Sequence, residues 1–110
     1  MLFDVHMYSE YSSTSAVDSV LSQMQSSSIP IVVGEFGWQL NGQSVAWQQI
    51  LTTCNNLGIG YVAWSWSGND ASSSQLDMAQ DWEGPLTSWG QDVMTHQYGI
   101  ANTSQPASIF

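Results

Sequence analysis

The chain has 110 residues, no Lys or Arg and nine Asp and Glu, so its formal net charge is −9. Such a surface repels phosphate backbones and anionic lipids, which excludes nucleic-acid and membrane-surface partners and leaves neutral polymers such as polysaccharides compatible. At 43% hydrophobic residues the chain is long enough for one small domain with a core, and we expect a single unit over residues 1–110.

The first predicted strand covers residues 2–8. Apolar residues alternate along it with residues that become polar toward its end. The two-residue period of a strand places His6 and Tyr8 on the same face.

A linker rich in Ser and Tyr leads to the first predicted helix. Ser15 and Asp18 have the spacing of a capping box, which predicts that Ser15 caps this helix. Apolar residues continue at helical spacing through Met24, and Pro30 opens the next strand.

The second predicted strand ends in Glu35, the most informative residue of the chain. The residues before it are almost all apolar, as in a strand buried on both faces of a parallel sheet. Strict alternation places Glu35 on the face of Ile31 and Val33. An ionised carboxylate there is costly unless it is paired or used in chemistry, and the chain has no Lys or Arg to pair with it. Glu35 is therefore a candidate catalytic residue.

The second predicted helix follows a turn at Asn41 and Gly42. Ser44 is expected to cap it, and Gly58 is a natural C-terminal stop. Its apolar face includes Cys54, the only cysteine, so no disulfide forms within the chain. This position predicts a buried, unreactive thiol.

The third predicted strand covers residues 59–66, with Trp64 and Trp66 on one face. A polar loop follows, after which Thr87 is expected to cap the last helix and Gly99 to end it. The acidic residues of the loop are interpreted as solvated charges: Asp70, Asp77, Asp81 and Glu83.

Strands that alternate with helices predict an α/β fold with a parallel sheet, whose chemistry lies beyond the carboxyl ends of the strands. His6, Tyr8, Glu35 and Trp64 all fall at those ends. A carboxylate, a phenol, an imidazole and indoles suit carbohydrate chemistry, because indole faces stack on the C–H faces of sugars. Retaining glycosidases use two carboxyl groups about 5 Å apart, and Glu35 is a candidate for one of them. Three strands leave two open edges, which indicates part of a larger sheet.

Other interpretations of these residues stay open at this point. His6 also fits a structural histidine, Tyr8 an ordinary core residue and Trp64 simple packing. Trp38 and Trp66 fit a sugar platform and loop packing equally. The spacing of His, Cys, Asp and Glu matches no metal motif, and no glycine-rich phosphate motif is present, so we expect neither a metal nor a cofactor.

Three motifs in order on successive strands resemble glycoside hydrolase family 5, and within it the bacterial-type endo-β-1,4-mannanases. They are His-Met-Tyr at 6–8, Gly-Glu-Phe-Gly at 34–37, and the run from Gly58 to Trp66. Further segments fit the same group, so the resemblance covers essentially the whole chain: 76–78, 86–90 and 103–110.

The resemblance implies a (β/α)8 barrel and a retaining mechanism. Because such barrels need about 250 residues, the chain is expected to be the C-terminal portion, with strands six to eight and their helices. By resemblance Glu35 is the catalytic nucleophile, and His6 and Tyr8 are the strand-six pair that lines the reaction subsite. Trp64 corresponds to the tryptophan that stacks under the sugar at the cleavage point.

The resemblance also implies that Trp38 and Trp66 line the cleft. The family's acid/base on strand four and its strand-two arginine have no counterpart in this sequence. The expected function is endo-acting hydrolysis of β-1,4-mannan. A β-1,4-glucanase of the same family and a noncatalytic carbohydrate-binding or inactive fragment remain alternatives. Expected partners are the polysaccharide and the N-terminal part of the barrel, and the family implies a secreted protein.

Overall fold

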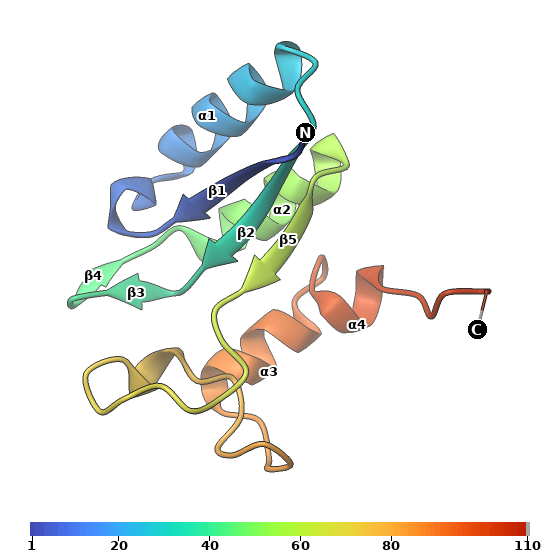
Figure 1. Cartoon of the computed structure of the whole chain (residues 1–110). Coiled ribbons are helices and arrows are strands. Elements are labelled where there is room, and N and C mark those ends of the chain that lie inside the picture. The colour runs from blue at the N-terminus through green and yellow to red at the C-terminus, as the bar shows by residue number, and fades with distance from the viewer. Residues whose placement is uncertain (110) are drawn as a thin grey trace.

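The computed structural model describes residues 1–109 and has the predicted α/β architecture. Strands and helices alternate along most of the chain (Figure 1). In chain order the elements are β1 (Phe3–Met7), η1 (Ser9–Tyr11), α1 (Thr14–Ser26), β2 (Ile31–Phe36), β3 (Gln39–Leu40), β4 (Gln43–Ser44), α2 (Trp47–Leu57), β5 (Gly60–Ala63), η2 (Ser74–Leu76), α3 (Ser88–Thr95) and α4 (Ile100–Thr103).

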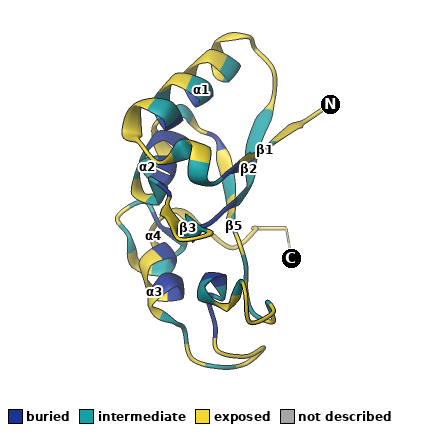
Figure 2. Cartoon of the chain, turned by 90° about the vertical axis from the view of Figure 1, so that its left-hand side faces the viewer, coloured by how far each residue is buried: buried dark blue, intermediate teal, exposed yellow. Residues whose placement is uncertain are grey.

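The main sheet has the order β1-β2-β5, and both strand pairs are parallel, as the sequence predicts. Helices cover one face of this sheet, whereas the described residues leave the other face open (Figure 2). Val62, for example, has an exposed fraction of 56% in the middle of β5. We call this second side the open face.

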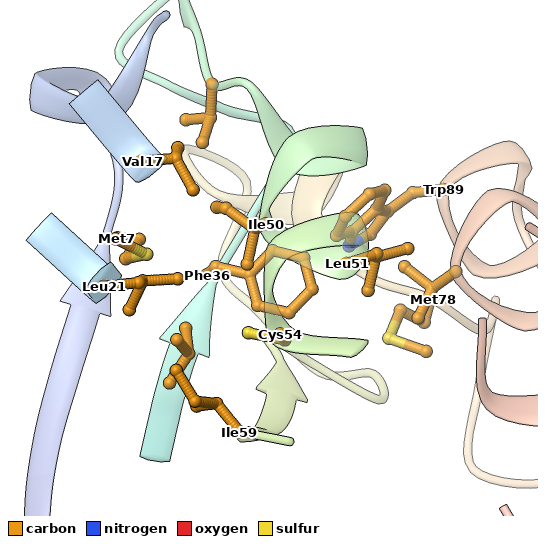
Figure 3. Packing of buried hydrophobic residues seen from close by; sticks show 13 residues of the cluster. Met7, Val17, Leu21, Phe36, Ile50, Leu51, Cys54, Ile59, Met78 and Trp89 are labelled. Carbon is orange, nitrogen blue, oxygen red and sulfur yellow. The ribbon is translucent and has the colours of Figure 1, made fainter. Parts of the chain in front are cut away.

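The core lies between the sheet and the helices. Figure 3 shows side chains from several elements gathered around Phe36, whose ring meets the rings of Tyr61 and Trp89 edge-on at centroid distances of 6.0 and 5.9 Å. Such edge-to-face pairs add to the stabilisation from burial. The buried cluster consists of Met7, Val17, Leu21, Val33, Phe36, Val45, Ile50, Leu51, Cys54, Ile59, Met78, Trp89 and Val93.

Cys54 is fully buried, as predicted. Burial disfavours the thiolate and raises the pKa of the thiol to about 12. The thiol is therefore kept in its unreactive, protonated form.

The start of α1 differs from the prediction. The cap is Ser13, whose Oγ accepts from the backbone N–H of Ala16 at 3.2 Å, and not Ser15. Asp18 does not close a capping box, because its Oδ1 accepts from the hydroxyl of Thr53 in α2 at 2.5 Å. A contact between helices thus replaces the local one.

The predicted cap of α2 is also wrong. Ser44 belongs to β4 and forms a short hairpin with β3 around Asn41 and Gly42, so α2 begins after Ala46 without a side-chain cap. The predicted stop is confirmed, because Gly58 adopts the left-handed conformation with φ 68°.

The last helix begins as predicted and ends earlier. Thr87 caps α3, and its Oγ1 accepts from the N–H of Gly90 at 3.1 Å. The helix stops at Thr95, and Gly99 precedes the short helix α4 instead of ending α3.

A β-bulge in β2 changes the face on which Glu35 lies. Asp4 pairs with Val32, but His6 pairs with Glu35, so two steps along β1 correspond to three along β2. The register between β2 and β5 shifts in the same stretch. An extra residue in one strand reverses the alternation beyond it.

Because of this bulge, Val33 and Phe36 both face the helices and are fully buried. The prediction that Glu35 shares the face of Val33 is therefore wrong. Glu35 lies on the open face beside its register partner His6.

None of the helices formed by residues 1–109 combines the length and apolar character needed to span a bilayer.

Candidate active site

Glu35 and Tyr8 meet at the carboxyl edge of the sheet. Glu35 is the penultimate residue of β2, and 25% of its side chain is exposed. Tyr8 follows β1 directly, and its hydroxyl donates to Oε1 of Glu35 at 2.6 Å. This length is typical of a bond from a hydroxyl to an ionised carboxylate. The bond fixes one oxygen of the carboxylate.

The pKa of Tyr8 is raised far above its ordinary value. Burial is the main cause, because it disfavours the phenolate, and Glu35 adds to it by accepting from the hydroxyl and through its negative charge. The hydroxyl therefore stays protonated at neutral and moderately alkaline pH and remains a hydrogen-bond donor.

His6 links this pair to a second carboxylate. Its Nδ1 lies 3.5 Å from Oε2 of Glu35, and its Nε2 lies 3.1 Å from Oδ2 of Asp4. Oδ1 of Asp4 accepts from the backbone N–H of Gly34 at 2.9 Å. We call Asp4, His6, Tyr8 and Glu35 the Glu35 network.

Trp64 follows β5 at the same edge of the sheet. Its side chain is 42% exposed, and its indole N–H donates to Oδ1 of Asn69 at 3.2 Å. Asn69 in turn donates to Oδ1 of Asp77 at 2.7 Å. The backbone N–H of Trp64 donates to the carbonyl of Phe36, and the carbonyl of Trp64 accepts from the indole N–H of Trp89 at 3.0 Å. Trp64 thus presents an exposed indole with a defined orientation.

Trp38 and Trp66 are held by the long loop after β5. The indole N–H of Trp38 donates to the carbonyl of Gln75 at 2.8 Å, and that of Trp66 to the carbonyl of Trp82 at 3.0 Å. Trp38 also lines a pocket of about 400 Å³ between this loop and helices α2 and α3. Both indole N–H groups are bonded to the loop rather than to the Glu35 network.

Three residues of the site were missed by sequence reasoning. Asp4 shares the two-residue period with His6 and Tyr8, so its place on the same face was available as a signal. Asp77 lies in the segment 76–78 that fits the family resemblance, whereas Asn69 carried no signal. The interpretation of Asp77 as a solvated charge is wrong, since it accepts from both the backbone and the side chain of Asn69.

Within residues 1–109, no three His, Cys, Asp or Glu side chains are grouped so that they could hold a metal ion. What the site offers chemically is a partly exposed carboxylate with one fixed oxygen, an imidazole between two carboxylates, and an exposed indole nearby along the sheet edge.

Comparisons with known proteins match this fold. A family model described as "Cellulase (glycosyl hydrolase family 5)" matches residues 1–70. The mannan endo-1,4-beta-mannosidase of Cellvibrio japonicus is 40% identical over 111 residues, which cover 100% of this chain and 26% of the relative.

Two solved structures of β-mannanases are also similar. The enzyme from Thermomonospora fusca has a TM-score of 0.92 and 34% identity, covering 98% of this chain and 36% of that one. The enzyme from Streptomyces thermolilacinus, solved with mannohexaose, has a TM-score of 0.87 and 34% identity over 98% of this chain and 36% of that one.

The parallel sheet and these similarities show that the chain has a glycoside hydrolase fold built from βα units. The chain belongs to glycosyl hydrolase family 5, which confirms the resemblance seen in the sequence. It spans about a quarter to a third of the length of the relatives that it matches.

Proposed function

We propose that this chain carries the nucleophile side of the active site of a retaining endo-β-1,4-mannanase. The observation that supports this most directly is the 2.6 Å bond from Tyr8 to Oε1 of Glu35 at the carboxyl edge of a parallel sheet. In barrels of this architecture, that edge is where catalytic residues lie.

Glu35 performs the first step of the proposed reaction. Because Oε1 accepts from Tyr8, Oε2 keeps its lone pairs for attack on the anomeric carbon of the sugar. A new C–O bond forms to Glu35, the glycosidic C–O bond breaks, and the leaving oxygen takes a proton from an acid. Water then hydrolyses the glycosyl–enzyme ester, and the acid recovers its proton from that water.

The proton donor belongs to another part of the barrel in this proposal. Asp4 is the other carboxylate of the Glu35 network, and its two oxygens already face Gly34 and His6. We therefore assign the chain to strands six to eight of a (β/α)8 barrel and the acid/base to strand four. In such a barrel, the open face of the sheet, with the exposed Val62, faces the interior that side chains of the remaining strands fill.

Sugar binding is assigned to the tryptophans at the strand ends. Trp64 stacks under the sugar at the cleavage point, because its indole is exposed and its orientation is fixed by Asn69. Trp38 and Trp66 line the cleft farther along. The chain has no Lys or Arg, which suits a neutral polymer. A polymeric substrate does not enter cells, so we place the enzyme outside the cell.

A hybrid barrel tests the function. In it, residues 1–110 replace the matching segment of the T. fusca β-mannanase, and mannan hydrolysis is measured. Glu35→Gln is expected to lower kcat by more than about 10³-fold, because the covalent step is lost. A 2-fluoro-mannosyl inhibitor should attach to Glu35, as peptide mass spectrometry can show. The control is Glu83→Gln in the exposed loop, expected to keep full activity. Activity near wild type in the Glu35 variant contradicts the assignment.

A second candidate is a β-1,4-glucanase, which the cellulase name of the family model favours. Rates of the hybrid on mannan and on soluble cellulose separate the two. A third is a noncatalytic carbohydrate-binding fragment. Binding of mannohexaose by the 110-residue chain, combined with an inactive hybrid, is the result that supports it.

A further inference from the structure

Asp4 has an unusual set of contacts for a residue on the surface. Its side chain is 53% exposed, yet each carboxylate oxygen has a different partner. Oδ1 accepts from the backbone N–H of Gly34 in β2 at 2.9 Å, and Oδ2 lies 3.1 Å from Nε2 of His6 in its own strand. One carboxylate therefore contacts both strands that carry the proposed nucleophile site.

The contact with Gly34 lies at the β-bulge. Gly34 falls between the register pairs Asp4–Val32 and His6–Glu35, where β2 has its extra residue. A Cβ on Gly34 would collide with Oδ1 of Asp4, so a side chain at this position would displace the carboxylate from its present place. Asp4 thus holds the backbone segment whose geometry turns Glu35 to the open face.

The contact with His6 fixes the imidazole. A histidine with one ring nitrogen held by a carboxylate has a defined ring plane and a defined proton position. With Nε2 as the donor to Asp4, Nδ1 of the neutral imidazole carries no proton, so it lies 3.5 Å from Oε2 of Glu35 without donating to it. Among residues 1–109, the carboxylates of Asp4 and Glu35 are the two charged groups that lie within 4.0 Å of the imidazole nitrogens.

We propose that Asp4 is a positioning residue, which sets the proton position of His6 with one oxygen and holds the Gly34 bulge beneath Glu35 with the other. This role of Asp4 rests on the proposed function only because Glu35 is taken there to be the nucleophile that Asp4 helps to position. The relation between Asp4, His6 and Gly34 can be measured without any sugar or hydrolysis.

The test uses the whole chain labelled with ¹⁵N in histidine and glycine. The ¹⁵N chemical shifts show which imidazole nitrogen carries a proton at about pH 8.5, above the ordinary range of imidazole. In the wild type, Nε2 of His6 is expected to carry the proton. In Asp4→Asn, the amide oxygen still accepts from Gly34 and the NH₂ group faces His6, so the proton is expected to move to Nδ1.

A second variant tests the other oxygen. In Asp4→Ala, exchange of the Gly34 amide hydrogen is expected to be faster by about tenfold or more, since a bond to a charged acceptor is lost. In Asp4→Asn this exchange should stay slow. Asp70→Asn is the matched control, because Asp70 is exposed, lies outside the Glu35 network and accepts from Ser72 in its own loop.

His96 is an internal control for the imidazole measurement. Its Nδ1 accepts from the backbone N–H of Tyr98, so its pattern should be the same in every variant. An unchanged proton position at His6 in Asp4→Asn overturns the proposal, even if Asp4→Ala fails to fold. If Asp4 were only a structural brace, Asp4→Ala would speed the exchange of the Gly34 amide hydrogen, but Asp4→Asn would leave the His6 proton on Nε2. If Glu35 is not the nucleophile, the His6 proton position and the Gly34 exchange rate still respond to Asp4 as described. Failure of the proposed function is therefore distinguishable from failure of the proposal for Asp4.

Discussion

Tyr8 and Glu35 lie 27 positions apart in the sequence, yet the hydroxyl of one donates to the carboxylate of the other at 2.6 Å across neighbouring strands. This bond orients the carboxylate, while its second oxygen, Oε2, lies 3.5 Å from Nδ1 of His6. The raised pKa of Tyr8 keeps the donor proton in place as the pH rises.

Removal of this hydroxyl should slow catalysis. For Tyr8→Phe in the hybrid barrel we expect kcat to fall by about 10- to 100-fold with little change in KM, because one hydrogen bond to a charged group is lost. Steady-state kinetics on mannan measure this. Tyr11→Phe is the control, since Tyr11 packs against the core and is not part of the Glu35 network. A variant at Tyr8 with full kcat shows that the bond has no catalytic role.

Trp64 should dominate sugar binding by this chain. Trp64→Ala is expected to weaken mannohexaose binding on the order of tenfold, since a truncated aromatic contact typically costs more than about 1 kcal/mol. Calorimetric titration measures it. Trp82→Ala is the matched control, because Trp82 is 79% exposed and its carbonyl, which a side-chain change retains, makes the bond to Trp66. Equal losses in both variants contradict a specific platform at Trp64.

The two faces of the sheet should respond differently to truncation. Phe36→Ala removes the centre of the core and is expected to lower the free energy of unfolding by about 3–5 kcal/mol. Val62→Ala on the open face is expected to lower it by less than about 1 kcal/mol. Urea unfolding of the chain gives both values. Similar losses at the two positions show that the open face is buried in solution.

Cys54 should be protected from modification. With its pKa at about 12, the thiolate is scarce near pH 8, and alkylation in the folded chain is expected to be about 10³-fold slower than for a free cysteine. Labelling followed by mass spectrometry measures the rate, with the urea-unfolded chain as the control. Rapid labelling of the folded chain contradicts the burial of this thiol.

The raised pKa of the Cys54 thiol also predicts how the free energy of unfolding depends on pH. The folded state binds the Cys54 proton more tightly than the unfolded state, so its contribution is complete below the unfolded pKa of about 8.5 and is lost as the pH rises toward about 12. The free energy of unfolding should fall less steeply with pH in Cys54→Ala. That variant carries a cavity cost at every pH, which does not affect the slope. Equal slopes from pH 8 to 10 contradict the prediction.

Local patterns in the sequence were sufficient for the architecture. The alternation of strands and helices predicted the parallel sheet, and the stop at Gly58 and the cap at Thr87 were correct. These features depend on residues within one turn or one strand, so they can be predicted from nearby positions. The roles of Glu35 and His6 in the reaction remain predictions, although the structure brings the two side chains together.

Contacts between distant segments decided the rest. The bulge at Gly34 depends on the register of three strands and on a side chain 30 positions away, so a strict two-residue period placed Glu35 on the wrong face. Asp77 became a support for Asn69 because the loop folds back on itself. The sequence by itself determined the main strands and helices and the family to which the chain belongs. Only the tertiary structure decided which way Glu35 points, because packing and pairing between strands, and not local propensity, set the position of an extra residue.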